Sequence, residues 1–326
     1  MKTACIYHSV DLDGWMSAAI VKHWFLLLNY NHLNNYFTFD LSKENNPYDS
    51  SSAETMSFLG YNYGQPIPDL SEYDKVIMCD ISFPKEEMEK IATKLIWIDH
   101  HISAIETMMY SEKFNSKVYN RFTQTNYAAC ELTWFNFFDE EPIPEIVRLL
   151  GRYDCFGHKG TSEENKVLEF QYGARQCISN YEEAFTELLC SLHNYPIASE
   201  IPILESGKAI YKYLCTEAKQ VYKNGFPILL QERVTGFPNS IEFINRRFIC
   251  FNKERFNPIN FGIDYHKDGY DGAACFHYAN GKWSFSIYND NGLVDCSIIA
   301  KSLKGGGHKG ASGFIVSDIN EFFGKS

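Results

Sequence analysis

The segment from Lys94 to His101 reads Lys-Leu-Ile-Trp-Ile-Asp-His-His, an apolar run that ends in one carboxylate and two imidazoles. A short apolar run followed directly by polar residues is typical of a buried strand. Two similar runs, Ala4 to Tyr7 and Lys75 to Cys79, come earlier in the chain and are followed by His8 and Asp80. Every strand predicted in the first part of the chain therefore ends at a residue that can bind a metal.

Segments with helical character separate these runs. Trp15 to about Leu28 follows the first run, and Pro84 to Thr93 carries Glu86, Glu87 and Lys90 at helical spacing. Short apolar strands separated by helices predict an α/β fold, with a parallel sheet that is covered by helices on both faces. In such a sheet the carboxyl ends of the strands meet at one edge, where ligands bind.

The chain has 326 residues, which favours two domains. We expect a first domain over residues 1–204, a linking helix over 205–225 and a smaller α/β domain over 226–326. The last region is predicted from its β-rich runs, which are Ile228 to Leu230, Arg247 to Asn252, Ala273 to Tyr278 and Trp283 to Tyr288. It ends in a glycine-dense tail from Lys304 to Phe314.

Composition and charge exclude several classes of protein. The formal net charge of −11 argues against a protein that grips long duplex nucleic acid, because binding of that kind needs basic residues to neutralise phosphates. The 10 cysteines are scattered without a CxxC pair, which indicates reduced thiols in the cytoplasm. No signal peptide and no apolar run of about 20 residues is found, so we expect a cytoplasmic protein without a membrane partner.

Carboxylates and imidazoles are the ligands that divalent cations such as Mn²⁺ prefer. Such groups stand at the predicted strand ends and element junctions: His8, Asp11, Asp13, Asp80, Asp99, His100, His101 and Asp154. Each has an ordinary alternative, since Asp11 and Asp13 can cap the helix that follows them. Asp80 can likewise cap a helix from Ser82 to Glu87. The joint pattern nevertheless favours a metal centre, because the ligands gather at one edge of the sheet.

Four segments resemble the motifs of the DHH phosphoesterase superfamily, in the same order along the chain. They are His8-Ser9-Val10-Asp11-Leu12-Asp13-Gly14, Cys79-Asp80-Ile81-Ser82, Ile98-Asp99-His100-His101 and Arg152-Tyr153-Asp154. The glycine run from Gly305 to Phe314 is similar to the accessory domain of the DHHA1 branch. The resemblance is strongest to its oligoribonuclease and cyclic-nucleotide phosphodiesterase-like members, some of which are labelled exopolyphosphatase-related.

The resemblance implies a centre of two divalent ions. One ion would be bound by His8, Asp11 and Asp80. The other would be bound by Asp13, Asp80, His100 and Asp154, which makes Asp80 the bridge. Mn²⁺ is the expected ion because imidazole suits it better than Mg²⁺, with Mg²⁺ or Co²⁺ as alternatives.

Two further residues receive catalytic roles from the resemblance. Asp99 would orient a ligand or the neighbouring backbone, and His101 would face the substrate phosphate. The implied reaction is an in-line attack on phosphorus by a hydroxide that bridges the two metals. Stabilisation of the equatorial phosphate oxygens would come from the ions and from His101.

The glycine run is the expected substrate-binding segment. Gly305, Gly306, Gly307 and His308 would offer backbone N–H groups and an imidazole to a phosphate or carboxylate. A flexible turn before the last strand is the alternative. Many DHHA1 proteins have an arginine near the preceding strand, but here that strand ends in Tyr288, which suits base stacking. The missing charge could come from Arg246, Arg247, Lys301 or Lys309.

Three other features stay open. The segment from Gly60 to Gly64, Gly-Tyr-Asn-Tyr-Gly, is either a ligand-side loop or a plain tight turn. Arg175 is a candidate for the active cleft. Asp295 either caps the helix from Ser297 to Leu303 or contacts the ligand, and we expect capping.

The expected function is that of a metal-dependent hydrolase, a phosphodiesterase acting on short oligonucleotides or on linear or cyclic dinucleotides. Its partner would be a short nucleic acid or nucleotide, and the chain would be a monomer or a homodimer. The alternative is an exopolyphosphatase, pyrophosphatase or phosphomonoesterase (phosphoadenosine phosphate-type) with the same metal centre. A non-catalytic nucleotide-binding protein is disfavoured because no expected ligand position is lost.

Overall fold

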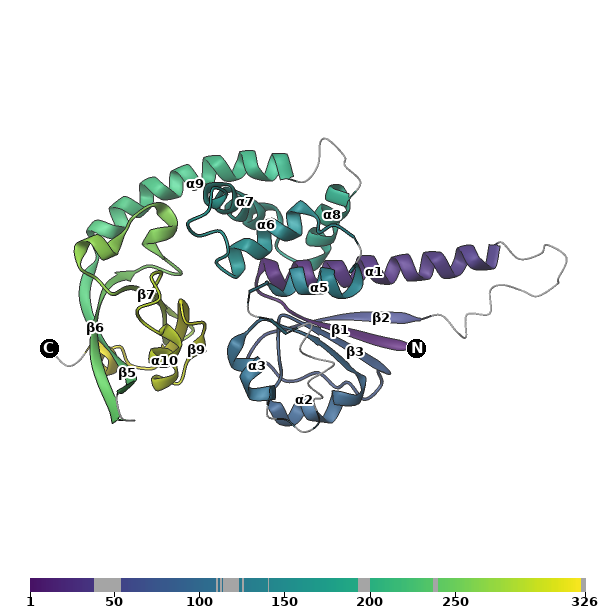
Figure 1. Cartoon of the computed structure of the whole chain (residues 1–326), viewed down its shortest axis with the longest axis horizontal. Helices are drawn as coiled ribbons and strands as arrows, with labels where there is room; N and C mark the ends of the chain where they lie inside the picture. Colours follow the sequence, from purple (N-terminus) through teal and green to yellow (C-terminus); the bar gives the residue numbers. More distant parts are fainter. Residues whose placement is uncertain are drawn as a thin grey trace. The chain divides into compact units, whose positions relative to one another are not determined.

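The computed structural model describes residues 1–37, 54–109, 111, 113, 123–124, 126–139, 141–192, 200–236 and 240–323. The chain divides into two compact units, Met1–Lys208 and Ala209–Ser326 (Figure 1). Each unit contains its own β-sheet, and helices accompany both sheets. The fold is therefore mixed α/β, as expected.

The sheet of the first unit has four strands in the order β2-β1-β3-β4. The strands are β1 (Lys2–His8), β2 (Thr55–Tyr61), β3 (Lys75–Cys79) and β4 (Leu95–Ile98). All neighbouring pairs are parallel. The expected parallel sheet is thus present, and the carboxyl ends of its strands lie at one edge.

Strand β2 is a correction to the sequence analysis, which predicted three strands here and a metal-ligand type of residue at the end of each. β2 ends at Tyr61, an aromatic residue. Its sequence, Thr-Met-Ser-Phe-Leu-Gly-Tyr, lacks the continuous β-branched run that marks the central strands, and most of its residues are only partly buried. It occupies an edge of the sheet, where one side needs no partner strand.

Helices cover both faces of this sheet (Figure 1). On one face, Cys5 and Ile77 of the strands pack with residues of α1 (Leu12–Phe37) and α5 (Ala129–Phe137). On the other face, Ile6 and Met78 pack with Met88 of α2 (Lys85–Ile91) and with Met108 of α3 (Ile102–Met109). Successive residues of one strand therefore enter opposite cores, which is why these strands are apolar at every position.

Four longer helices complete the first unit or lead out of it: α6 (Glu145–Asp154), α7 (Glu164–Cys177), α8 (Tyr181–Leu192) and α9 (Glu200–Lys223). Helix α9 begins five residues before the expected linking helix. It lies directly on α7, because a Cβ added to Gly207 would come within 1.9 Å of the Glu169 carbonyl oxygen. Gly173 of α7 makes a similar approach to the Ile203 carbonyl oxygen, at 2.0 Å.

The second unit has a six-stranded sheet in the order β5-β6-β7-β8-β10-β9. The strands are β5 (Phe226–Gly236), β6 (Ser240–Asn252), β7 (Gly272–Ala279), β8 (Lys282–Tyr288), β9 (Gly306–Gly307) and β10 (Ala311–Val316). All neighbours are antiparallel except β6 and β7. The four β-rich runs that the sequence predicts lie within β5 to β8.

Each face of this second sheet also has a core. One core includes Phe248 and Phe285 of the sheet and Ile299 of α10 (Cys296–Ser302). The other includes Phe251 of the sheet, Ala218 of α9 and Tyr265. Short helices complete the chain: η2 (Ala92–Lys94), η3 (Pro258–Phe261), η4 (Tyr265–Asp268) and α11 (Asn320–Phe323). No helix in the described part of the chain is long and apolar enough to cross a membrane.

Candidate metal centre

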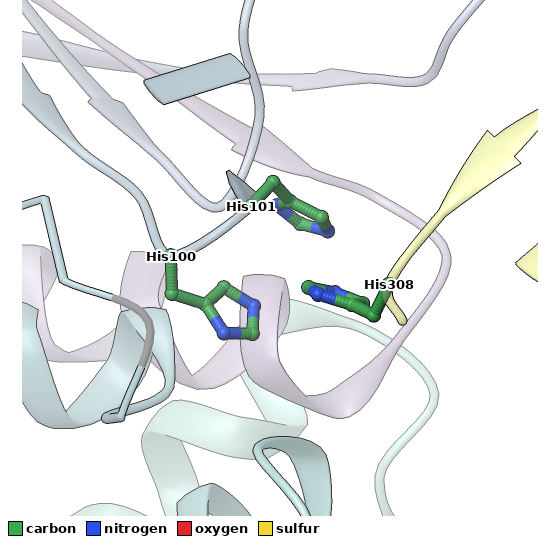
Figure 2. Close-up of side chains that lie close together, drawn as sticks. All are labelled: His100, His101 and His308. Carbon is green, nitrogen blue, oxygen red and sulfur yellow. The ribbon is translucent and has the colours of Figure 1, made fainter. Parts of the chain in front are cut away.

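The centre of the candidate site is formed by three strand ends. His8 is the last residue of β1, Asp80 follows β3, and Asp99 follows β4 and precedes His100 and His101. Figure 2 shows the imidazoles of His100 and His101, which leave adjacent positions of the chain. Their ring centroids are 4.7 Å apart. The parallel order of the strands thus brings together residues from three distant parts of the sequence.

Asp11 joins this cluster from the turn between β1 and α1. Its Oδ1 accepts a hydrogen bond of 3.0 Å from the Gly14 N–H, which is the capping interaction considered as the alternative. Its Oδ2 lies 2.8 Å from Nδ1 of His8. The turn tolerates only glycine at position 14, because a Cβ there would come within 2.0 Å of the His8 carbonyl oxygen. Capping and membership of the cluster are therefore compatible.

Asp13 is buried, with 3% of its surface exposed, and it does not cap the helix that contains it. Its two oxygens instead accept hydrogen bonds from Ala129 N–H at 2.9 Å and Cys130 N–H at 2.7 Å, at the start of α5. Its Oδ2 also lies 3.6 Å from Nε2 of His100. The N-terminus of α5 therefore fixes this carboxylate, since unpaired N–H groups and the helix dipole attract negative charge there.

Asp80 occupies the middle of the cluster and is 1% exposed. Its Oδ2 lies 3.4 Å from Nδ1 of His8, and its Oδ1 lies 3.4 Å from Nε2 of His100. In the part of the chain that the structure describes, the buried Oδ1 has no hydrogen-bond partner. The backbone of Asp80 has φ = 60°, a left-handed conformation that non-glycine residues rarely adopt. Capping does not account for this residue, because the next helix, α2, begins at Lys85 after Pro84.

Asp154 reaches the cluster from the last residue of α6. Its Oδ2 lies 3.2 Å from Nε2 of His100. Helix α6 is anchored by the buried Leu149 and Leu150, which face the helical core of this unit. His100 thus faces carboxylates of three different elements.

Asp99 is fully buried and holds the segment that follows β4. Its Oδ1 accepts hydrogen bonds from the backbone N–H groups of His100 at 2.7 Å and of His101 at 3.0 Å. The same oxygen lies 2.7 Å from Nδ1 of His101. This oxygen therefore fixes both the backbone of the tripeptide and the orientation of the His101 ring.

The histidines titrate abnormally because of the carboxylates around them. Burial opposes protonation of His8, yet the carboxylates of Asp11 and Asp80 raise its pKa to about 11. Burial likewise opposes protonation of His101, yet Asp99 raises its pKa to about 9. Both rings are therefore held in a strongly negative environment.

Two of the carboxylates, Asp154 and Asp13, show the same excess of negative charge. Burial and the neighbouring carboxylate of Asp80 raise the pKa of Asp154 to about 6, against the opposing effect of His100. Burial and the carboxylates of Asp80 and Asp154 raise the pKa of Asp13 well above its usual range. In the described part of the chain, the ion pairs of these carboxylates all have histidine as the partner. Histidines are therefore the side chains that balance the negative charge of the described part of this cluster.

The donor atoms fit a centre of two divalent cations. His8, Asp11 and Asp80 have donor atoms within 4.8 Å of one another, as do Asp13, His100 and Asp154. These two groups contain carboxylate oxygens and imidazole nitrogens, the donors that Mn²⁺ and related ions accept. Oδ1 of Asp80, which has no hydrogen-bond partner among the described residues, can bind a cation. A third group, Asp80, Asp99 and His101, shares Asp80.

The sequence analysis did not single out a supporting ion pair behind the cluster. Arg152 donates to both carboxylate oxygens of Glu131, with a distance of 2.7 Å to Oε1. Glu131, 2% exposed, also accepts from the Ala128 N–H at 3.0 Å, so this pair fixes the start of α5. The sequence signal for such a cap is Ser or Thr three residues before the Glu, and because Ala128 stands there the cap follows only from the structure.

The glycine run of the second unit forms a tight edge of the sheet. Gly306 and Gly307 form β9 and pair with β10. A Cβ at Gly305 would come within 2.1 Å of the Gly313 carbonyl oxygen, and Gly307 has φ = 137°. His308 donates its N–H to the Ala311 carbonyl at 2.7 Å. Close packing against β10 explains the need for glycine at Gly305 and Gly307.

The other candidates for substrate contacts lie in the second unit, on or near its sheet. Tyr288 is the last residue of β8 and packs against the core that contains Phe251. Arg246 pairs with Glu232 at 2.7 Å, and the Arg247 guanidinium lies 4.5 Å from the centre of the Tyr270 ring. The side chains of Lys301 and Lys309 are exposed.

Arg175 and Asp295, the two remaining candidates from the sequence, have specific contacts. The exposed Arg175 lies over the rings of Tyr153 and Tyr172, at 5.4 Å and 5.3 Å from their centres. Tyr153 precedes Asp154, so this group adjoins the cluster in the sequence. Asp295 caps α10 as expected, since its Oδ1 accepts from the Ser297 N–H at 2.9 Å.

Comparison with known proteins finds distant similarities. No family model matches the sequence. An uncharacterized protein of Acanthamoeba polyphaga mimivirus is 23% identical over 276 residues, which cover 79% of this chain. The matched region spans 57% of the length of that relative.

The solved structures that align with this chain are also only distantly similar to it. An exopolyphosphatase-related protein from Bacteroides fragilis aligns with a TM-score of 0.42 and 14% identity, over 96% of this chain and 86% of that chain. A pGpG-specific phosphodiesterase from Vibrio cholerae aligns with a TM-score of 0.39 and 11% identity, over 99% and 95% of the two chains. RecJ from Thermus thermophilus, in complex with Mg²⁺, aligns with a TM-score of 0.35 and 11% identity, over 99% and 47%. Each of these similarities is too low to transfer an activity.

Proposed function

We propose that this protein is a metal-dependent phosphoesterase that hydrolyses a phosphodiester in short oligonucleotides or in linear or cyclic dinucleotides. The first unit would be the catalytic part and the second unit the substrate-binding part. The resemblance of four sequence motifs to the DHH phosphoesterases and the geometry of the cluster both support this function. It concerns only this chain, whatever else its longer relative does.

The observation that carries the proposal is the position of Asp80 between two groups of ligands. One of its oxygens faces His8, and the other faces His100, each at 3.4 Å from a ring nitrogen. A carboxylate that presents its two oxygens to two separate ligand sets is the arrangement that a pair of neighbouring cations requires. Its left-handed backbone supports the same role, since strained conformations concentrate at functional sites.

The proposed ligands follow from the two groups of donor atoms. His8, Asp11 and Asp80 would bind one ion, and Asp13, His100 and Asp154 would bind the other. Asp80 would join the second set through Oδ1, which lies beside His100. When bound, two such ions supply a nucleophile at neutral pH and neutralise the charge that develops on the phosphate. We favour Mn²⁺ because the donor set combines imidazole with carboxylate.

The other residues of the first unit would position and assist. Asp99 would keep His101 in one orientation through its contact with Nδ1. The opposite ring nitrogen, Nε2, could then donate to a phosphate oxygen. Asp13 would be held in place by the start of α5.

The second unit would supply the substrate contacts. Gly305, Gly306, Gly307 and His308 would face a phosphate or carboxylate of the substrate, and Tyr288 would contact the nucleotide. Gly306 suits this role because a Cβ there would meet nothing within 4 Å, so the backbone is open to a ligand. Its neighbours are fixed by close packing on β10.

The test is product analysis on the purified chain. The protein is incubated with Mn²⁺ and, in separate reactions, with a linear dinucleotide, a cyclic dinucleotide, polyphosphate and phosphoadenosine phosphate. We expect mononucleotide products from a dinucleotide, and no products when a chelator is added. Release of phosphate from polyphosphate without cleavage of any dinucleotide would support the exopolyphosphatase alternative instead. Absence of turnover with every substrate would overturn the proposal.

A further inference from the structure

Tyr63 belongs to the Gly60 to Gly64 segment that the sequence analysis left open, and it lies beside the metal cluster. The residue sits in the turn that follows β2. Its ring centroid is 6.1 Å from the ring centroid of His8. Its hydroxyl lies beside Ser82 and in the field of the Asp99 and Asp80 carboxylates. The segment is therefore both a tight turn and a neighbour of the cluster.

The turn holds Tyr63 firmly. The Tyr63 N–H donates to Oδ1 of Asn62 at 2.8 Å, and the Asn62 N–H donates to Oε1 of Gln65 at 2.9 Å. The Gln65 N–H returns to the Asn62 carbonyl at 3.1 Å. Gly64 has φ = 87°, which a residue with a Cβ rarely adopts. These contacts use the backbone and the polar neighbours, so the phenol ring is not needed to form the turn.

Tyr61, two residues earlier, shows what a structural tyrosine looks like in the same segment. Tyr61 is 5% exposed and packs edge-on against Phe83, with ring centroids 4.9 Å apart. Tyr63 is 54% exposed. A large aromatic ring that is exposed while its hydroxyl is directed toward Ser82 leaves the ring itself available to a ligand.

We infer that Tyr63 is a specificity-determining residue, whose ring stacks on the base of a nucleotide when the nucleotide's phosphate lies at the His8–Asp80 side of the cluster. The inference rests on the proposed function. Stacking on an aromatic side chain accepts any base, because every base has a π-face. Tyr63 thus selects substrates that carry a base over phosphoesters that do not, without discriminating between bases.

The experiment compares two substrates that differ only in their bases. One is a dinucleotide of two deoxynucleotides, and the other is the same sugar–phosphate backbone without bases. We expect Tyr63→Ala to lower kcat/KM for the dinucleotide about 10-fold, the size of one lost stacking contact, and to leave the abasic substrate unchanged. Tyr63→Phe keeps the ring and should keep the wild-type preference. Tyr63→Leu has similar bulk without a π-face and should behave like the alanine variant.

The outcomes separate this inference from the proposed function. If wild-type protein cleaves neither substrate, the proposed function fails. If wild-type protein cleaves both and Tyr63→Ala lowers both equally or neither, the inference is wrong while the proposed function stands. If Tyr63→Phe loses activity as alanine does, the hydroxyl and not the ring is responsible, which also overturns the inference.

Discussion

Two buried carboxylate sites in this protein differ in how their charge is balanced. In the second unit, Glu232 is 3% exposed; its Oε2 accepts from the Arg246 guanidinium at 2.7 Å and its Oε1 from the Asp295 N–H at 2.7 Å. In the first unit, Asp80 is equally buried, yet its Oδ1 has no hydrogen-bond partner within the described ranges of the chain.

The difference teaches how a structural carboxylate can be told from one that awaits a ligand. Burial of a charge is costly, so a carboxylate with a purely structural role has a matched cation and saturated oxygens. The strand-end cluster of the first unit gathers five carboxylates whose ion pairs, among the described residues, are all with histidines: Asp11, Asp13, Asp80, Asp99 and Asp154. The raised pKa values of Asp13 and Asp154, beside neighbouring carboxylates, are the electrostatic pattern of a functional site.

Replacement of the central carboxylate should give the largest effect. Asp80→Asn keeps the shape of the side chain and removes the charge that both proposed ions share. We expect metal-dependent turnover to fall by at least about 1,000-fold, since both ions contribute several kcal/mol to the barrier reduction. Turnover is measured with Mn²⁺ on the substrate that the wild type cleaves, and circular dichroism checks the fold. Normal activity with two bound ions would show that Asp80 is not the bridge.

A peripheral ligand should have a smaller effect on turnover and a different effect on stability. Asp154→Asn removes one ligand of one proposed ion, and we expect a loss of about 100-fold in turnover. Because the pKa of Asp154 is raised to about 6, its charge opposes folding at pH 8 when no metal is bound. The metal-free variant should therefore melt at the wild-type temperature or above it. A thermal midpoint several degrees lower would contradict the idea that this charge is uncompensated.

Replacement of Glu232, the carboxylate that pairs with Arg246, should lower stability and leave metal binding unchanged. Glu232→Gln leaves the Arg246 guanidinium without its carboxylate, and we expect a loss of about 2 kcal/mol in the free energy of unfolding. Urea denaturation measures this loss, with Glu242→Gln on the exposed part of β6 as the matched control. Mn²⁺ affinity should not change. Equal stability of the two variants would remove the distinction between the sites.

The pH dependence should be the smallest effect, a shift of a few degrees in thermal midpoint. His101 has a pKa raised to about 9, so its protonation stabilises the metal-free fold fully below about pH 6.5, and this contribution is lost as the pH rises through 9. The thermal midpoint of the metal-free protein should therefore decrease as the pH is raised from 6.5 to 9. Bound cations replace the protons, so saturating Mn²⁺ should raise the midpoint more at pH 9 than at pH 6.5. Scanning fluorimetry with Mn²⁺ or a chelator measures both trends.

The sequence was sufficient for the central strands and for the gathering of polar residues at their ends. Continuous apolar runs such as Lys75 to Cys79 identify strands that are buried on both faces, and parallel order then brings His8, Asp80 and Asp99 to one edge. The length of α1 was underestimated, because its later turns contain asparagines that lower helix propensity. β2 was missed because its half-buried edge position leaves no periodic pattern.

Contacts between distant segments could not be predicted from the sequence. The hydrogen bonds from α5 to Asp13 join residues more than a hundred positions apart. The exposure of Tyr63 also depends on tertiary packing. The sequence motifs at the strand ends indicate which types of residue come together. The hydrogen-bond partner of each carboxylate oxygen follows only from the folded chain.

The left-handed backbone at Asp80 restricts which residues position 80 can hold. A side chain other than Asn or Asp there would cost about 1 kcal/mol or more in backbone strain, and glycine would relieve it. A library of all substitutions at this position, sorted for folded protein, should therefore be enriched in Gly, Asn and Asp. The same library sorted for turnover should keep Asp alone. The difference between the two selections would separate what the chain needs in order to fold from what it needs in order to react.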